Sequence, residues 1–389
     1  MINVLFLPHA FPHAKLKTRT GELTRELAKD PGFSVFVLSR AASPLQDLKY
    51  GLKHGLARAT TAVWREEEGH LTYLKIPFIP GAFPGLYLFN RRLLEKALRA
   101  FDIHVVINSF AHSLSVPPSP DRVSIYDLAD DYAGFHGNPL IKALVSSYIR
   151  RESRGCDALT TVSLTLGERI RARGWKRDFT WLPNGVSADR FQESSPQAGE
   201  PIRTRFGLRD KIVIGHIGSQ DRFSGLDFLL DVFNKAQTVE PRLALLVVGP
   251  GDEAERLGPL YASNPNVVFA GPVDPAEISP YFAAADVGVL PYAPLPSVHS
   301  RFPLRLAEFT AARKIVVAWP FGDLARLRLP NVVLAKRTPE AWVDALLRSK
   351  DLAWNPRWED LRREFSIARV VSRLKELIFK LLKDKGLSR

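Results

Sequence analysis

The fold is decided by the stretch at residues 290–318, LPYAPLPSVHSRFPLRLAEFTAARKIVVA. It reads as a strand end, a loop, a helix beginning near Phe302 or Pro303, and a second strand opened by a lysine. The free amide groups at the start of that helix, with Arg301 and Arg305 beside them, predict a pyrophosphate site. Helix N-termini favour anions, and arginine adds paired donors.

Glu308 follows Arg305 by one helical turn. At that position its carboxylate is placed to accept hydrogen bonds from a ribose diol, as acidic residues do in other nucleotide-binding α/β domains. The alternative is that the two side chains form a surface pair worth only a few tenths of a kcal/mol. The segment by itself leaves both interpretations open.

Short apolar runs alternate with amphipathic helical segments on both sides of this stretch. We expect strands at 4–7, 35–39, 71–76, 104–107, 123–126 and 158–162 in the first half, and at 212–218, 243–249, 266–271, 287–292 and 314–319 in the second. This rhythm predicts an α/β chain of two doubly wound, Rossmann-like domains, each with a mostly parallel sheet covered by helices on both faces.

The 389 residues are enough for two domains. A polar, turn-rich run, QESSPQAGEP, indicates where they divide. We expect an N-terminal acceptor-binding domain at 1–190, a linker at 191–201, a donor-binding domain at 202–365, and an amphipathic helix at 366–389. Ligands of such sheets bind at the carboxyl ends of the strands, so a cleft between the domains is the expected functional region.

The terminal helix carries one apolar stripe flanked by lysines and arginines. We interpret it chiefly as a packing helix, with a basic membrane-surface helix as the alternative.

The chain is basic, with 54 Lys and Arg against 41 Asp and Glu, a net charge of +13. That excess favours an anionic partner, which is a nucleic acid, a phosphorylated ligand or an acidic lipid surface. No helix-turn-helix, zinc-finger or RNP-type motif accompanies it, so no nucleic acid is expected. A single cysteine and the lack of a long apolar run favour a cytoplasmic protein, either free or bound peripherally at the inner face of the cell membrane.

Six segments occur in a fixed order along the chain. They are TTVSLTLGERIRARG, WLPNGVSADRF, IGHIGSQDRFSGLDFLL, LLVVGPGDE, NVVFAGPVDPAEISPYFAAADVGVLPY and FPLRLAEFTAARKIVVA. This series resembles the signature of nucleotide-sugar glycosyltransferases with the GT-B fold, closest to family four of the retaining enzymes and its bacterial polysaccharide-type relatives. The resemblance covers about 157–318. The first 150 residues match in architecture and at SIYDLADDYAGF, 124–135.

The resemblance implies a metal-independent, hexosyltransferase-like enzyme. It would move a sugar from a nucleoside-diphosphate sugar, such as a UDP-sugar, to a hydroxyl of a glycan or lipid-linked acceptor in bacterial surface polysaccharide or glycoconjugate synthesis. No cofactor is expected. The rival hypotheses are a non-catalytic sugar-nucleotide-binding relative and a basic nucleic-acid-binding protein.

The donor-binding residues that follow from this resemblance lie in the second half. They are Gly218, Ser219, Gly249, Pro272, Val273, Tyr292, Ser300, Arg301, Phe302, Pro303, Leu304 and Glu308. Three positions depart from the family pattern: Ser300 replaces the first acid of the acidic pair, and Ser219 and Ser224 replace the usual Arg and Lys. These departures shift neutralisation of the diphosphate onto Arg222 and Arg305, with Arg301 as a further candidate, and we count Arg222 and Arg305 as catalytic candidates.

Three aspartates follow the expected strand at 123–126. Asp130 or Asp131 is a candidate base for the acceptor hydroxyl, whereas strand alternation makes Asp127 a structural candidate. Asp130 has an alternative role as a helix N-cap. His112 and His136 are alternative bases, because histidine has the better pKa near neutrality.

The stretch IPFIPGAFPGLYLFNRR at 76–92 is rich in aromatics, Pro and Gly. One interpretation is a packed loop. The other is an acceptor-side surface that meets a lipid headgroup. Its aromatic residues at the interface would be Phe83, Tyr87 and Phe89, with Arg91 and Arg92 on the phosphates.

Overall fold

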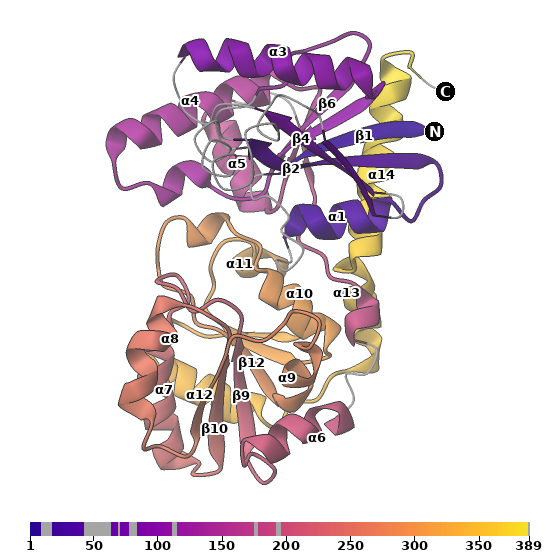
Figure 1. Cartoon of the computed structure of the whole chain (residues 1–389). Helices are drawn as coiled ribbons and strands as arrows, with labels where there is room; N and C mark the ends of the chain where they lie inside the picture. Colours follow the sequence, from indigo (N-terminus) through magenta and orange to yellow (C-terminus); the bar gives the residue numbers. More distant parts are fainter. Residues whose placement is uncertain are drawn as a thin grey trace, which may run out of the picture. The chain divides into compact units, whose positions relative to one another are not determined.

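The structure is a computed structural model, and it describes residues 1–8, 18–42, 64–68, 71–77, 84–110, 115–174, 178–191 and 196–387. The chain divides into two compact units (Figure 1). Unit 1 comprises Met1–Pro183 and Val370–Arg389, and unit 2 comprises Asn184–Arg369.

Unit 1 is built on an eight-stranded sheet in the order β3-β4-β2-β1-β5-β6-β7-β8. All neighbouring pairs are parallel except β3 with β4. The strands are β1 (Ile2–Leu7), β2 (Phe33–Ala42), β3 (Trp64–Glu68), β4 (Leu71–Pro77), β5 (Val105–Asn108), β6 (Val123–Leu128), β7 (Ala158–Thr161) and β8 (Phe179–Trp181). Its central strands β5 and β6 are buried along their whole length, as expected of a parallel sheet covered on both faces.

Among the described residues, unit 1 contains the C-terminal helix, described below, and the helices α1 (Arg19–Leu27), α3 (Pro84–Ala100), α4 (Pro139–Gly155) and α5 (Leu164–Ala172), with the short 3₁₀ turn η2 (Tyr132–Phe135) before α4. Local sequence sets where three of them begin. The side chains of Thr18, Asn138 and Ser163 each accept hydrogen bonds from backbone N–H groups in the first turn of α1, α4 and α5. Leu94 and Leu98 of α3 pack into the core beside Leu5 and Val106 of the sheet.

Unit 2 has a six-stranded, fully parallel sheet in the order β11-β10-β9-β12-β13-β14. The strands are β9 (Ile212–Ile217), β10 (Leu243–Val248), β11 (Val267–Gly271), β12 (Val287–Leu290), β13 (Ile315–Ala318) and β14 (Val332–Leu334). This is a doubly wound order, in which the chain reverses its direction across the sheet between β9 and β12. In such sheets, ligands bind outside the carboxyl ends of the strands at that switch point.

Helices and short turns connect these strands and cover the sheet (Figure 1). They are η3 (Ala188–Phe191), α6 (Pro196–Arg205), α7 (Leu226–Val239), α8 (Asp252–Leu257), η4 (Gly258–Tyr261), α9 (Ser279–Ala284), η5 (Val298–Ser300), α10 (Leu304–Ala311), α11 (Leu324–Leu327), α12 (Pro339–Ser349), η6 (Pro356–Trp358) and α13 (Glu359–Glu364). The expectation of two α/β domains with parallel sheets is confirmed.

The C-terminal helix α14 (Ile367–Asp384) lies almost wholly in unit 1. Its apolar stripe, including Leu374 and Ile378, is buried. Ion pairs from Lys375 to Asp30 and from Lys385 to Asp157 hold its polar edges. It is therefore a packing helix of unit 1, and not a separate C-terminal segment.

Two boundaries differ from the sequence-based prediction. The units divide at Pro183, and the expected linker at 191–201 lies inside unit 2, where α6 occupies Pro196–Arg205. Gly199 allows α6 to approach α9 closely, since an added Cβ would collide with the backbone of Ala284. The polar composition of this segment suggested a linker, but the segment contains a helix that packs against α9.

The expected loop at 76–92 is the second difference. Residues from Pro84 onward form the first part of α3, which buries Leu94, Ala97 and Leu98. Proline is common at the first position of a helix, and Pro84 is the first residue of α3. The Pro/Gly-rich composition had instead suggested a loop.

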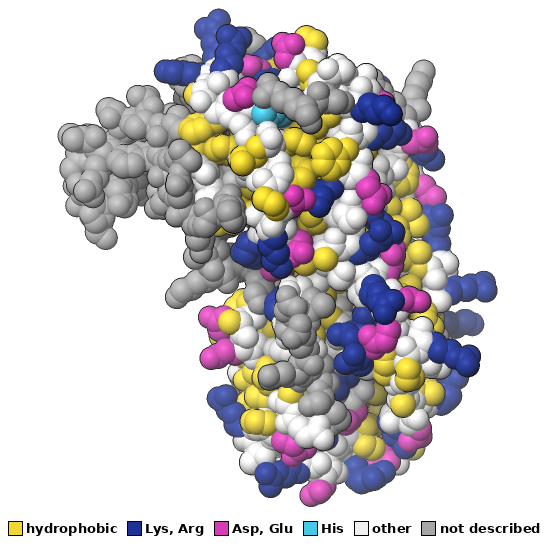
Figure 2. All heavy atoms as spheres, turned by 90° about the vertical axis from the view of Figure 1, so that its right-hand side faces the viewer, with side chains coloured by type: hydrophobic (Ala, Val, Ile, Leu, Met, Phe, Trp, Pro, Cys, Tyr) yellow, Lys and Arg dark blue, Asp and Glu magenta, His cyan; other side chains and the backbone are white. Residues whose placement is uncertain are grey.

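No helix in the described part of the chain combines the length and apolar composition that a bilayer crossing requires. On the face drawn in Figure 2, Lys and Arg side chains are scattered among acidic ones over both units. On this face the excess positive charge forms no continuous stripe.

Candidate functional site

Two glycines end neighbouring strands of unit 2 at the switch point. Gly218 follows β9 with φ 125°, and Gly249 follows β10 with φ 124°. A Cβ at Gly218 would collide with the guanidinium of Arg305, and one at Gly249 would collide with the carbonyl of Gly218. Both positions therefore require glycine, since any side chain would fill the space where the two turns and Arg305 meet.

Arg305 lies in the first turn of α10 and is 7% exposed. Its Nη2 donates to the carbonyl of Ser219, and its guanidinium lies 5.6 Å from the centre of the Tyr292 ring. Its Nη1 is buried and has no hydrogen-bond partner among the described residues. A buried guanidinium with an unused donor fits an anionic ligand, because leaving such a group unpaired is costly.

His216 lies in β9, two residues before Gly218, and is completely buried. Burial lowers the pKa of its imidazole well below the usual range, and the positive charge of Arg305 lowers it further. His216 is therefore neutral near pH 7. His216 is not among the predicted site residues, and its one sequence signal is its position inside an apolar strand.

Gln220 holds the turn that carries the candidate anion site. Its Nε2 donates to the carbonyls of Gly218 at 2.8 Å, Val248 at 3.2 Å and His216 at 3.3 Å. These bonds join the ends of β9 and β10, so the carbonyl of Ser219 that receives Arg305 belongs to a fixed turn. Gln220 is a second residue that sequence analysis missed.

Glu308, one turn after Arg305, forms an ion pair with Arg190 at 3.7 Å. Arg190 also donates to the carbonyl of Pro275 at 3.3 Å, in the loop after β11. Asn184 joins the same segment to α10 by donating to the carbonyl of Phe302 at 2.7 Å. Arg305 and Glu308 therefore do not form the surface pair considered as an alternative. Arg305 donates to Ser219, and Glu308 pairs with Arg190.

Two other arginines lie on one aromatic ring. The guanidinium groups of Arg222 and Arg301 are each 4.7 Å from the centre of the Phe223 ring. Arg222 is exposed, whereas Arg301 is half-buried. Arg222 is therefore available to a ligand from solvent but does not share the buried position of Arg305.

The departures from the family pattern have distinct surroundings. Ser219 is exposed, but Ser224 and Ser300 are buried. Ser224 Oγ has no hydrogen-bond partner among the described residues. A long cationic side chain at Ser224 would have to extend from a buried position.

The remaining donor-site candidates surround the start of α10 and the end of β11. Pro303 is the N-cap of α10 with an extended backbone, and Leu304 is its first residue, so the helix starts one residue later than the sequence suggested. Phe302 is buried against Phe365, and the carbonyl of Tyr292 accepts a hydrogen bond from Trp319. The other two, Pro272 and Val273, lie at the surface directly after β11, exposed and half-buried respectively.

In unit 1, the three aspartates of the acidic segment have different surroundings. Asp127 is 2% exposed and accepts hydrogen bonds from Nε and Nη2 of Arg19, both at 3.1 Å, and from the Thr160 hydroxyl at 2.7 Å. Asp131 is buried and pairs with Arg169 at 3.1 Å and Arg173 at 3.6 Å. Asp127 is therefore structural, as strand alternation suggested.

Asp130 is half-buried, and its Oδ1 accepts a hydrogen bond from the backbone N–H of Asp131 at 3.0 Å. The residue at the N-cap of η2 is Asp131, so Asp130 does not cap that turn. His136 is exposed at the end of η2, whereas His112 lies outside the described residues.

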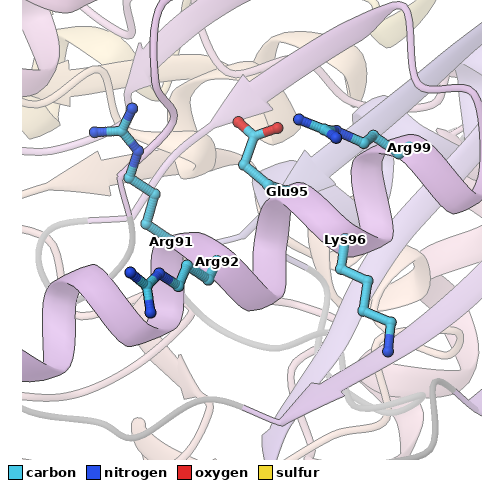
Figure 3. Close-up of a pocket in the computed structure, with 5 residues that line it drawn as sticks. All are labelled: Arg91, Arg92, Glu95, Lys96 and Arg99. Carbon is cyan, nitrogen blue, oxygen red and sulfur yellow. The ribbon is translucent and has the colours of Figure 1, made fainter.

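The basic end of the predicted acceptor-side stretch lies on α3. Arg91 and Arg92 are exposed, and with Glu95, Lys96 and Arg99 they line a hollow of about 630 Å³. Figure 3 shows Arg91, Glu95 and Arg99 on one side of the helix and Arg92 and Lys96 on the other. Phe83 lies outside the described residues, and Tyr87 and Phe89 are placed only as part of the α3 backbone.

Part of the chain is similar in sequence to known glycosyltransferases. Residues 211–350 match the family model described as glycosyl transferases group 1. A putative teichuronic acid biosynthesis glycosyltransferase, TuaH of Bacillus subtilis, is 35% identical over 159 residues, which are 39% of this chain and 36% of TuaH. A GDP-mannose-dependent α-(1-6)-phosphatidylinositol monomannoside mannosyltransferase of Mycolicibacterium smegmatis is 30% identical over 147 residues, 37% of this chain and 38% of that protein. The chain thus covers little more than a third of either relative.

Solved structures match over nearly the whole chain. Sucrose-phosphate synthase from Thermosynechococcus elongatus superposes with a TM-score of 0.71, covering 99% of this chain and 100% of that one at 16% identity. Anabaena HepE, solved in complex with UDP and glucose, gives 0.69 over 97% and 99% at 16% identity. The chain has the GT-B fold, and residues 211–350 of its second unit match the model of the group 1 glycosyl transferases.

Proposed function

We propose that the protein transfers a sugar from a nucleoside-diphosphate sugar to a hydroxyl group of a glycan or lipid-linked acceptor. The observation that carries the proposal is the buried Arg305 guanidinium, which has an unused donor beside two glycine turns at the switch point of a doubly wound sheet. A diphosphate is the ligand whose charge and oxygen atoms complete this site.

Residues of unit 2 take the donor side of the reaction. Arg305 and the first amides of α10 neutralise the charge that develops on the departing diphosphate. Glu308 accepts from the ribose hydroxyls, and the main chain at Pro272 and Val273 lies beside the base. In this proposal no metal ion is required, because a cation and helix amides take the role that a divalent ion has elsewhere.

Residues of unit 1 take the acceptor side. The bond from the anomeric carbon to the diphosphate oxygen breaks, and the acceptor oxygen bonds to that carbon while its hydrogen leaves as a proton. Where the reaction inverts the anomeric carbon, Asp130 receives the proton, since Asp127 and Asp131 are held in buried ion pairs. Where it retains configuration, the diphosphate oxygen receives it.

The relatives' names suggest the class of acceptor. One is named for teichuronic acid biosynthesis and the other for transfer to a phosphatidylinositol mannoside. We therefore propose a role in bacterial surface polysaccharide or glycoconjugate synthesis, in the cytoplasm at the inner face of the membrane. The basic hollow on α3, with Arg91 and Arg92, supplies positive charge for an anionic headgroup.

A second candidate function is sugar-nucleotide binding without transfer. The specific observation in its favour is that Ser300, at the position of the first family acid, is completely buried. A chain of this kind would bind the nucleotide but would not hydrolyse or transfer the sugar.

The testing experiment is a thermal-shift panel of nucleoside diphosphates and their sugars, repeated with EDTA. UDP is the first nucleotide to try, because HepE was solved with it. Ligand at about 100 times its dissociation constant stabilises the folded state by about 2.7 kcal/mol, which raises the melting temperature. No shift with any nucleotide contradicts the proposal. A shift without donor hydrolysis or transfer selects the binding-only function, and a shift abolished by EDTA contradicts metal independence.

A further inference from the structure

The start of helix α4 projects an apolar turn into solvent. Leu140, Ile141 and Leu144 are 74%, 44% and 55% exposed. Every residue from 136 to 144 is exposed, and burial of the helix begins only at Val145. Soluble proteins seldom keep several large aliphatic side chains together in water unless the patch binds something.

This turn is a well-specified element. Pro139 occupies its first turn, and the Asn138 side chain accepts hydrogen bonds from the backbone N–H groups of Leu140 at 2.9 Å and Ile141 at 3.3 Å. The sequence therefore fixes the helical end that carries these apolar side chains.

The same side of α4 changes character along its length. At 3.6 residues per turn, Leu140, Leu144, Arg151 and Arg154 lie on one stripe, and all four are exposed. The stripe is thus apolar for two turns and basic for the last two. With a rise of 1.5 Å per residue, about 10 Å separates Leu144 from Arg151.

No exposed acid opposes this charge on α4. The exposed charged residues of the helix, Lys142, Arg150, Arg151 and Arg154, are all cationic, and its single acid, Glu152, is buried and pairs with Arg151 at 3.6 Å. The exposed charge that α4 presents to an anionic surface is therefore positive.

We propose that the first two turns of α4 insert into the headgroup region of an anionic lipid bilayer, with Arg151 and Arg154 on the lipid phosphates. If α4 enters end-on, the axial rise of about 10 Å between Leu144 and Arg151 leaves the arginines near the phosphates while the apolar turn reaches a depth that interfacial apolar side chains commonly reach, about 5–10 Å. A projecting turn enters a deformable bilayer readily, whereas a protein partner would need a matching cavity.

The first turns of α4 lie close to the acidic segment of unit 1. The short turn η2 packs against α4 and begins directly after Asp131. A bilayer at Leu140 and Leu144 therefore lies next to the acidic segment in the same unit. On the proposed function, this brings the hydroxyl of a lipid-linked acceptor to Asp130.

The test is flotation of the full chain with phosphatidylcholine vesicles that contain about one third phosphatidylglycerol. The triple variant Leu140→Ser, Ile141→Ser, Leu144→Ser should lower the partition coefficient at least about tenfold. The matched control is Val239→Ser, Leu260→Ser, Leu352→Ser in unit 2, where exposure is 64%, 70% and 50%. The control should bind like the wild type. Equal binding by the triple variant overturns the proposal and leaves a protein partner or a second copy as the occupant.

A second measurement works with a single substitution. The chain's only cysteine, Cys156, is buried, so a polarity-sensitive dye will label Leu144→Cys selectively. Anionic vesicles should shift its emission to the blue, while dye at Leu260→Cys should keep its aqueous spectrum. An unshifted label at 144 overturns the proposal. Both experiments are made without nucleotide, and thermal shifts of the same variants with UDP report separately on the proposed function.

Discussion

Arg190 lies 3.7 Å from Glu308 and also reaches the carbonyl of Pro275. One guanidinium therefore joins α10, which carries the candidate ribose acid, to the loop after β11, which lies beside the candidate base site. Both side chains of the pair are largely buried, 19% and 14% exposed. Such a pair is costly to break from one side.

Removing Arg190 should weaken nucleotide binding without a direct contact to the diphosphate. Arg190→Ala frees the base-side loop from α10 and leaves the Glu308 charge without this partner, so we expect affinity for a nucleoside diphosphate to fall about tenfold. The measurement is calorimetry in a double-mutant cycle with Glu308→Gln. The cycle should show a coupling of about 1 kcal/mol, and strict additivity would contradict it. Arg242→Ala, which removes a surface pair with Glu240, is the control.

Arg305 should contribute more than any other arginine of unit 2. Arg305→Ala removes a charge-assisted donor, and we expect nucleoside diphosphate binding to weaken by about 1.5 to 3 kcal/mol. Arg313→Ala is the matched control, since Arg313 lies two residues after the end of α10 and pairs with Glu359 at 2.7 Å. Calorimetry that gives the same affinity for Arg305→Ala and Arg313→Ala would remove Arg305 from the site.

Most strands along the chain, the presence of two largely parallel sheets and the position of Arg305 in the first turn of α10 were predictable from sequence, because each depends on local patterns. The strands β3, β8 and β14 were not expected. Apolar runs mark buried parallel strands, and a proline before an amphipathic stretch marks the start of α10. The structural role of Asp127 followed from strand alternation in the same way.

Other features depend on contacts that no local pattern reports. Arg190 and Gln220 act on residues distant in the chain, and a charged or amide side chain in a loop gives no signal of such a partner. The helix α6 was concealed by polar residues and by Pro201 in its interior. Its stability depends on packing against α9, and tertiary packing routinely overrides propensity.

Asp130 and Asp127 should respond in opposite ways to the same change. Asp130→Asn keeps an oxygen that accepts from the Asp131 N–H but removes the basic carboxylate, so turnover should fall at least about a hundredfold with little change in melting temperature. Asp127→Asn disturbs a buried pair with Arg19, and we expect it to cost about 3 kcal/mol in the free energy of unfolding. Transfer assays and chemical denaturation of both variants provide the check. Full activity of Asp130→Asn would exclude it as the base.

His216 should make unit 2 sensitive to acid. Its pKa in the folded protein is well below the usual value, because burial and Arg305 both disfavour the imidazolium. The unfolded chain then binds a proton near pH 6.5 that the folded chain does not, so this residue's contribution is complete above about pH 6.5 and is lost as the pH falls below it. The loss is at most about 1.4 kcal/mol per pH unit. Denaturation between about pH 7.5 and about pH 5.5 should therefore show a steeper loss for the wild type than for His216→Leu. His136→Leu, at an exposed position, should follow the wild type. A wild-type slope in His216→Leu would show that other groups account for the acid sensitivity.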